Sequence, residues 1–145
     1  MNFTTTRSLS RSSRITSWTA QIVAAAILGQ TLFFKFAAAP ESIALFEKLG
    51  AEPYGRIGLG IVELIAVILL LVPRTAVLGG VLTVGLMSGA VVSHLTVLGI
   101  DTNGDGGALF ALAIVTLVSG LVVTGLRRAE LPIVGRVLAP AAAAE

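Results

Sequence analysis

The chain has 145 residues, of which 55% are hydrophobic and 12% are charged, and its formal net charge is +2 at pH 7. A mean hydropathy of +0.95 with so few charges excludes an ordinary water-soluble domain, in which about 25% of the residues are charged. The sequence has no cysteine and one histidine, His94, which excludes disulfide exchange, thiolate catalysis and a bis-histidine haem within the chain.

The first 17 residues are rich in serine, threonine and arginine and contain no acid. We expect residues 1–17 to form a disordered basic tail. Because the apolar run that follows ends in three alanines at 37–39, a cleaved signal peptide is an alternative. The run is longer than a signal-peptide core and is interrupted by Gln21, Gln30 and Lys35, so we favour an uncleaved first span.

Four apolar stretches predict transmembrane helices at residues 18–39, 54–72, 76–100 and 108–126. Each reaches or approaches the roughly 20 residues that a helix needs to cross about 30 Å of hydrocarbon. The connections are too short to hold a soluble domain, and the tight turn after residue 72 makes the second and third spans antiparallel neighbours. The predicted fold is an all-α integral membrane protein, an antiparallel four-helix transmembrane bundle over residues 18–128.

The segment between the first two spans predicts a short helix at residues 40–50, which begins with proline and ends with glycine. Ile43, Phe46 and Leu49 recur about once per turn, whereas Glu47 and Lys48 point away from them. We expect this amphipathic helix to lie flat on the outer membrane surface.

Basic residues collect on one side of the predicted membrane. That side has Arg7, Arg11, Arg14, Arg74, Arg127, Arg128 and Arg136, and the other has Lys48 and Arg56 together with Glu41, Glu47, Glu52, Asp101 and Asp105. By the positive-inside rule, both termini, including a C-terminal tail at 129–145, face the cytoplasm. The pI of about 9.7 therefore reports topology, and nucleic acid is not an expected partner.

The second span carries an acid, Glu63, near mid-depth. A charge there costs a few kcal/mol unless it faces protein or water. Because Glu63 shares a helical face with Arg56, Gly60 and Val67, we expect it to point into the bundle. Lys35, near the outer end of the first span, has two interpretations: it snorkels to the headgroups, or it forms an ion pair with Glu63.

His94 lies near the outer end of the third span, on the face of Thr83, Met87 and Ala90. A lone histidine in a span is more often a hydrogen-bonded packing residue than a ligand, although its ordinary pKa suits proton transfer. Lys35, Arg56, Glu63 and His94 all fall in the outer half of the bundle, which makes that half the candidate site.

The loop before the fourth span matches the first half of a calcium-binding EF-hand loop through Asp101, Asn103 and Asp105. The twelfth position, where a bidentate glutamate belongs, is Leu112. We therefore favour a polar turn that leads into a helix over a calcium site.

Small residues predict where the spans pack closely. These are Gly85 and Gly89 in the third span, Gly58 and Gly60 in the second, and Gly120 in the fourth. We expect them to build the bundle, with an oligomer interface as the alternative.

The ordered set of short motifs around Lys35, Glu63, Leu71-Val72-Pro73-Arg74, His94 and Gly104-Asp105-Gly106-Gly107 resembles the DoxX family of small bacterial membrane proteins, over about residues 20–128. The resemblance implies a four-helix bundle of the bacterial inner membrane, associated in some members with thiosulfate-to-quinone electron transfer or with redox-stress complexes. It also implies that Lys35, Glu63 and His94 form the polar core and that a quinone is the first ligand to test.

Three functional hypotheses follow. In the first, a quinone binds in the outer half, where His94 and Lys35 donate hydrogen bonds, Glu63 shuttles protons, Arg56 lies at the rim, and Phe33, Phe34 and Met87 line an apolar slot. In the second, the chain is a non-catalytic membrane subunit whose redox partner brings the cofactors. In the third, a homo-oligomer forms a small carrier or channel.

Overall fold

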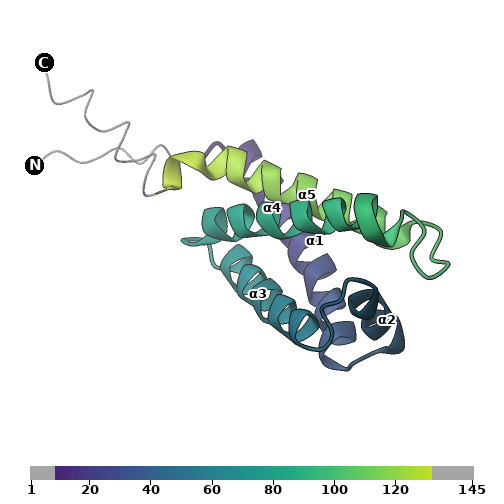
Figure 1. Ribbon diagram of the computed structural model, residues 1–145. Coiled ribbons are helices and arrows are strands. Elements are labelled where there is room, and N and C mark those ends of the chain that lie inside the picture. Colours follow the sequence, from purple (N-terminus) through teal and green to yellow (C-terminus); the bar gives the residue numbers. More distant parts are fainter. Residues whose placement is uncertain (1–8, 132–145) are drawn as a thin grey trace, which may run out of the picture.

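The computed structural model describes residues 9–131, and no strand occurs in that range. Its elements are α1 (Arg11–Phe36), α2 (Pro40–Lys48), α3 (Tyr54–Leu71), α4 (Ala76–Ser93), a π-helical segment (His94–Leu98), α5 (Ala108–Arg127) and a 3-10 turn (Arg128–Glu130) (Figure 1). Four of the helices, α1, α3, α5 and α4 with its π-helical extension, are long and apolar enough to cross a membrane. The predicted all-α, four-span architecture is confirmed.

The first span begins earlier than the sequence predicted. Ser10 caps α1, because its hydroxyl oxygen accepts a hydrogen bond from the Ser13 backbone N–H at 3.1 Å. Residues 11–17, expected in a disordered tail, are helical, since neither glycine nor proline interrupts them and Ser17 is buried in the bundle. Residues 1–8, with Arg7, and residues 132–145, with Arg136 and most of the expected C-terminal tail, lie outside the described residues.

The short helix predicted after the first span is present as α2. Pro40 occupies the first turn, and the chain leaves the helix through Gly50, whose φ of 68° favours glycine. Phe46 is buried, whereas Glu47 and Lys48 are exposed. The Lys48 ammonium donates a hydrogen bond to the Leu98 carbonyl oxygen at 3.0 Å, which joins α2 to the end of the π-helical segment.

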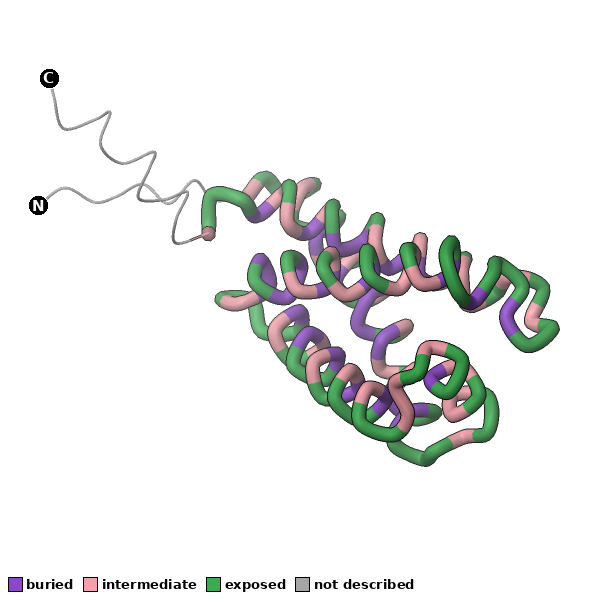
Figure 2. Tube along the Cα trace, in the orientation of Figure 1, coloured by how far each residue is buried: buried purple, intermediate pink, exposed green. Residues whose placement is uncertain are grey.

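The spans form a ring in which each helix packs against two others. α1 and α4 lie diagonally opposite, and α3 and α5 each contact both of them. α4 and α5 run side by side, whereas α3 diverges from α4 beyond their connecting turn (Figure 1). Buried residues line the facing sides of the helices and exposed residues point outward (Figure 2). The shared core is apolar and consists of Ala24, Leu28, Ala66, Leu70, Met87, Ala113 and Val123.

Close helix contacts occur at some of the expected glycines and not at others. A Cβ on Gly120 would lie 3.2 Å from the Gly80 carbonyl oxygen, and one on Gly60 would lie 3.1 Å from the Phe36 ring. Gly58, Gly85 and Gly89 would meet nothing within 4 Å. The expectation that these three pack inside the bundle is wrong. The interior face of α4 is instead formed by Ala76, Val77, Gly79, Gly80, Thr83 and Met87, and that of α3 by Arg56, Gly60, Glu63, Ala66 and Leu70.

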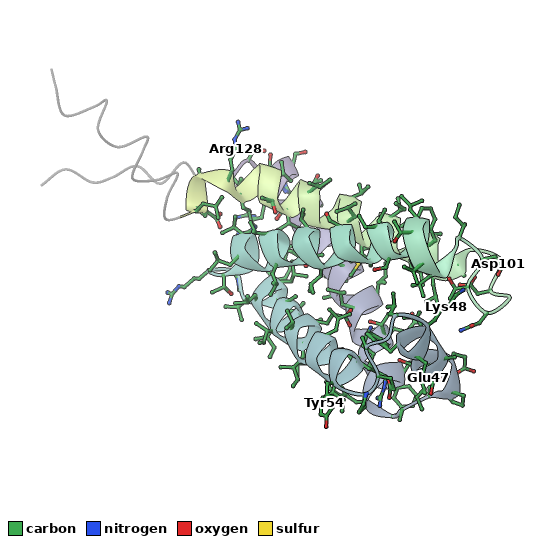
Figure 3. All side chains as sticks on the ribbon, in the orientation of Figure 1. Glu47, Lys48, Tyr54, Asp101 and Arg128 are labelled. Carbon is green, nitrogen blue, oxygen red and sulfur yellow. The ribbon has the colours of Figure 1, made fainter. Side chains whose placement is uncertain are left out.

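The two ends of the bundle differ in charge. Figure 3 shows Glu47, Lys48, Tyr54 and Asp101 at one end and Arg128 at the other. We call the first the acidic end; its charged residues are Glu41, Glu47, Glu52, Asp101, Asp105, Lys48 and Arg56. We call the second the basic end; its charged residues are Arg11, Arg14, Arg74, Arg127, Arg128 and Glu130.

Candidate functional site

Glu63 and Lys35 form a buried ion pair between α3 and α1. Lys35 Nζ lies 2.8 Å from Glu63 Oε2, and the side chains are 11% and 4% exposed, respectively. The Thr31 hydroxyl, one turn before Lys35, also contacts Glu63 Oε2 at 3.1 Å. Of the two interpretations of Lys35, the structure therefore shows the ion pair. Each charge offsets part of the desolvation penalty that the other would bear if it were buried alone.

Arg56 lies about two turns before Glu63 on α3 and also binds to the end of α1. Its Nε and Nη2 bind the Glu52 carboxylate at 2.8 to 2.9 Å, and its Nη1 donates to the Lys35 carbonyl oxygen. The last carbonyl groups of a helix have no partner within the helix, so Arg56 satisfies one of them at the end of α1. The guanidinium is thus held by α1 and by the chain just before α3.

His94 belongs to a separate hydrogen-bond network. Its Nδ1 lies 2.9 Å from the Gly99 carbonyl oxygen and 3.2 Å from the Thr102 hydroxyl. A carbonyl oxygen can only accept, so Nδ1 carries the proton, and in neutral His94 the other ring nitrogen, Nε2, is an acceptor. The ring also packs edge-on against Phe110, with the centroids 5.7 Å apart.

The expected convergence of four ionisable groups is therefore only partly present. Lys35 and Glu63 are in direct contact, and Arg56 joins them through the Lys35 carbonyl oxygen. Between residues 9 and 131, no hydrogen bond or ion pair connects His94 with either member of the pair. His94 holds the 99–107 connection against the end of α4, which is the packing role that sequence reasoning favoured.

The residues expected to line an apolar slot do not share one environment. Met87 is 7% exposed and belongs to the core cluster. Phe33 and Phe34 are 70% and 42% exposed on α1, and their rings contact each other edge to face at 5.7 Å. Because both rings are exposed on the outside of the bundle, they do not line an interior slot.

The loop at Asp101, Asn103 and Asp105 is built as a helix cap. Asp105 Oδ1 accepts from the backbone N–H groups of Thr102 and Gly107 at 2.9 Å each, and Oδ2 accepts from Leu109 at 2.8 Å. Asp101 Oδ1 accepts from Gly106 N–H at 3.1 Å. The carboxylates thus serve the start of α5, and in the described part of the chain no three Asp, Glu or His side chains gather to hold a metal.

These contacts lower the pKa of Asp105 below its ordinary value. The hydrogen bond from Leu109 N–H has the largest effect, those from Gly107 and Thr102 add to it, and burial opposes them. The nearby His94 side chain acts in the same direction as the hydrogen bonds. Asp105 is therefore a carboxylate at neutral pH, as a cap at the positive end of a helix should be.

The family model of the DoxX-like family matches residues 19–119. The chain belongs to the DoxX-like family. The matched segment contains Lys35, Arg56, Glu63, His94 and the 99–107 connection, and it ends within α5. Comparisons with curated proteins and with solved structures found no match. The chain is thus a DoxX-like membrane protein with four candidate spans.

This DoxX-like protein also has a buried polar network that sequence reasoning missed, at the basic end. Arg127 is 6% exposed; its Nε donates to the Ser17 hydroxyl at 2.8 Å, and its Nη1 donates to the Pro73 carbonyl at 3.1 Å and to Glu130. The Gln21 amide also donates to Ser17, at 2.8 Å, while Gln21 Oε1 has no partner among the described residues. The available signal was the i, i+4 spacing of Ser17 and Gln21 on one face of an apolar helix.

Proposed function

We propose that this DoxX-like protein is a quinone-linked membrane subunit of a redox system, in which the Lys35–Glu63 pair holds a quinone carbonyl oxygen. One observation carries the proposal: an acid and an amine from two different spans form a buried 2.8 Å ion pair. Ionisable groups are rare inside transmembrane spans, and where they occur they commonly mark a functional site. The quinone itself is the ligand class that the family resemblance implies.

The residues around the pair suit this ligand. A lysine ammonium has three N–H donors, and the carboxylate of Glu63 engages one side of it, which leaves a donor for a carbonyl oxygen. Phe33 and Phe34 face outward on the same helix, where an apolar ring or tail arriving from the bilayer would contact them. Met87 and His94, which the structure assigns to the core and to the loop network, are not part of the proposed site.

Reduction of a quinone takes up protons as well as electrons. Lys35 Nζ holds a proton beside the Glu63 carboxylate, and Thr31 hydrogen-bonds to that carboxylate. The role of this chain is therefore to bind and orient the quinone and to supply it with protons. A chain without cysteine and with one histidine does not itself offer a thiol pair or a bis-histidine haem. The electrons would therefore come from a partner protein.

The test is quinone binding by the purified protein in lipid nanodiscs, titrated with a short-chain quinone. The double variant Lys35→Met/Glu63→Leu removes both charges at once, so that neither is left unpaired, and we expect its affinity to fall by at least about tenfold. Lys48→Met removes a lysine from the same end, outside the pair, and should bind like the parent. Equal affinity in the parent and the double variant would contradict the proposal.

A second function, a non-catalytic assembly subunit, is favoured by a different observation. Lys35 and the two cations of the acidic end each join two elements: Lys35 joins α1 to α3, Arg56 joins α3 to the end of α1, and Lys48 joins α2 to the π-helical segment. In this case the charges serve helix registry alone. Purification in mild detergent separates the two functions. If the protein is an assembly subunit, the parent and the double variant should retain a redox partner equally, and neither should contain bound quinone.

We further propose that the protein lies in a bacterial inner membrane with its basic end in the cytoplasm. The support is the gathering of five described arginines at that end, which the positive-inside rule places inside. Because the chain has no cysteine, single cysteines can be introduced at Ala44 or at Arg74 and labelled with an impermeant maleimide in intact cells. We expect labelling of the cysteine at position 44 and not of the one at position 74. Labelling at position 74 but not at position 44 would show that the protein has the opposite topology.

A further inference from the structure

The basic end carries a positive surface that neither proposed function uses. Four exposed arginines come from three places: Arg11 and Arg14 from the first turn of α1, Arg74 from the α3–α4 turn, and Arg128 from the end of α5. The acid at this end, Glu130, pairs with the buried Arg127 at 3.1 Å. Within residues 9–131, none of the four exposed arginines has an ion-pair partner.

The backbone adds to this positive charge. α1 and α4 both begin at the basic end, and neither has an acid in its first turn. The start of a helix carries a partial positive charge, which proteins commonly offset with aspartate or glutamate. At the start of α1 the sequence instead supplies two arginines. The mismatch is resolved if an anion from outside the chain approaches this end.

The depth of the arginines identifies that anion. Arg11, Arg14 and Arg128 lie in the terminal turns of candidate spans, and Arg74 lies in the turn between two spans. Because the ends of a span meet the membrane surface, we expect these guanidinium groups at the level of the lipid headgroups. Figure 3 shows Arg128 pointing away from the bundle, toward its surroundings and not toward another helix. A guanidinium binds a phosphate group with two parallel hydrogen bonds, and a basic patch beside a span attracts anionic lipid.

We propose that the basic end binds anionic phospholipids through Arg11, Arg14, Arg74 and Arg128, with the headgroup phosphate as the ligand. A zwitterionic headgroup brings its own cation, which competes for the phosphate, so a lipid such as phosphatidylglycerol is preferred over phosphatidylcholine. This site lies at the opposite end from the Lys35–Glu63 pair and does not depend on the quinone proposal.

The experiment uses the full chain in phosphatidylcholine micelles or nanodiscs, to which phosphatidylglycerol is added. Native mass spectrometry counts bound lipids, and the thermal unfolding midpoint reports stabilisation. We expect phosphatidylglycerol to raise the midpoint and phosphatidylcholine not to. Each arginine removed should weaken binding about fivefold, so Arg14→Gln/Arg128→Gln should weaken it about 30-fold, from the ~1 kcal/mol that each basic residue contributes near an anionic surface. Arg14→Lys/Arg128→Lys should retain most of the affinity.

The matched control is Lys48→Gln, which removes one positive charge at the acidic end, as each single Arg→Gln substitution does at the basic end, and should leave lipid binding unchanged. An equal loss in Lys48→Gln would show a general charge effect and overturn the proposal. Equal stabilisation by inorganic phosphate at the same phosphate concentration would do so too, because the ligand would then be a free anion. If the glutamine variants fail to fold, the comparison of phosphatidylglycerol with phosphatidylcholine on the parent decides, and equal binding of the two lipids refutes the site.

Discussion

At the basic end α4 approaches α3 and α5 backbone to backbone, whereas at the acidic end charged side chains span the distance between the helices. A Cβ on Gly79 would lie 2.6 Å from the Leu70 backbone nitrogen, and one on Gly80 would lie 3.2 Å from the Thr124 backbone nitrogen. At the acidic end the Lys35–Glu63 pair and Arg56 connect α1 to α3, and Lys48 connects α2 to the end of the π-helical segment. α3 and α4 diverge toward that end (Figure 1).

The difference shows how one small bundle divides two tasks. Close packing needs small residues and leaves no room for a ligand, so the basic end is suited to fixing the arrangement of the helices. Charges that bridge diverging helices keep ionisable groups at a defined position in an apolar setting, so the acidic end is suited to chemistry or recognition. If the two ends divide the tasks in this way, the stability of variants should follow the same division.

The largest expected effect comes from breaking the ion pair on one side. Lys35→Met leaves the Glu63 carboxylate buried without its cation, and we expect a loss of about 3–5 kcal/mol in the free energy of unfolding. The double variant Lys35→Met/Glu63→Leu removes both charges and should recover most of this loss. Equilibrium unfolding in mixed micelles measures both. A double variant as unstable as the single variant would show that the pair is not an isolated electrostatic unit.

The next largest effect concerns the close approach at the basic end. Gly79→Ala places a methyl group against the Leu70 backbone, which cannot move aside as a side chain can, so we expect a loss near the upper end of about 1–3 kcal/mol. Gly85→Ala is the matched control on the same helix, where nothing lies within 4 Å. It should be neutral or stabilise by up to about 1 kcal/mol through helix propensity. Equal losses for both would mean that α4 packs through a different face.

Arg127→Met should cost less than Lys35→Met, about 2 kcal/mol, although both cations are buried. The partners that Arg127 leaves behind are a hydroxyl, a carbonyl and Glu130, whose side chain is 39% exposed and remains hydrated. The same unfolding measurement ranks the two variants. A larger loss for Arg127→Met would place the main electrostatic anchor at the basic end.

The sequence predicted the spans because hydrophobic length is a strong signal, and it predicted contact between Lys35 and Glu63 as one of two options because antiparallel spans bring them to similar depths. It did not predict which glycines face inward, since spans that are apolar on every side contain little information about helix rotation. Gly85 and Gly89 were misplaced for this reason.

Other contacts depend on loop geometry that periodicity does not encode. The partner of His94 is the carbonyl of Gly99, which has a φ of 82° and follows a π-helical segment. Neither feature can be derived from residue spacing. Arg127 was interpreted only as a marker of topology, because a terminal arginine gives no sign that it turns back to bond Ser17 across the bundle.

The smallest expected effect is at the cap of α5 and depends on pH. Because the folded-state pKa of Asp105 is lowered, its carboxylate stabilises the fold above the ordinary Asp pKa of about 3.9, and this contribution is lost as the pH falls through the lowered value. Asp105→Asn removes the charge but keeps one acceptor oxygen, so we expect a loss of about 1 kcal/mol at pH 7 that shrinks as the pH falls below the ordinary Asp pKa. Asp101→Asn, where a single backbone N–H is involved, should show a smaller loss at pH 7. Thermal midpoints at pH 7, 5 and 3 provide the comparison, and a gap for Asp105→Asn that does not narrow between pH 5 and pH 3 would mean that shape, not charge, makes the cap.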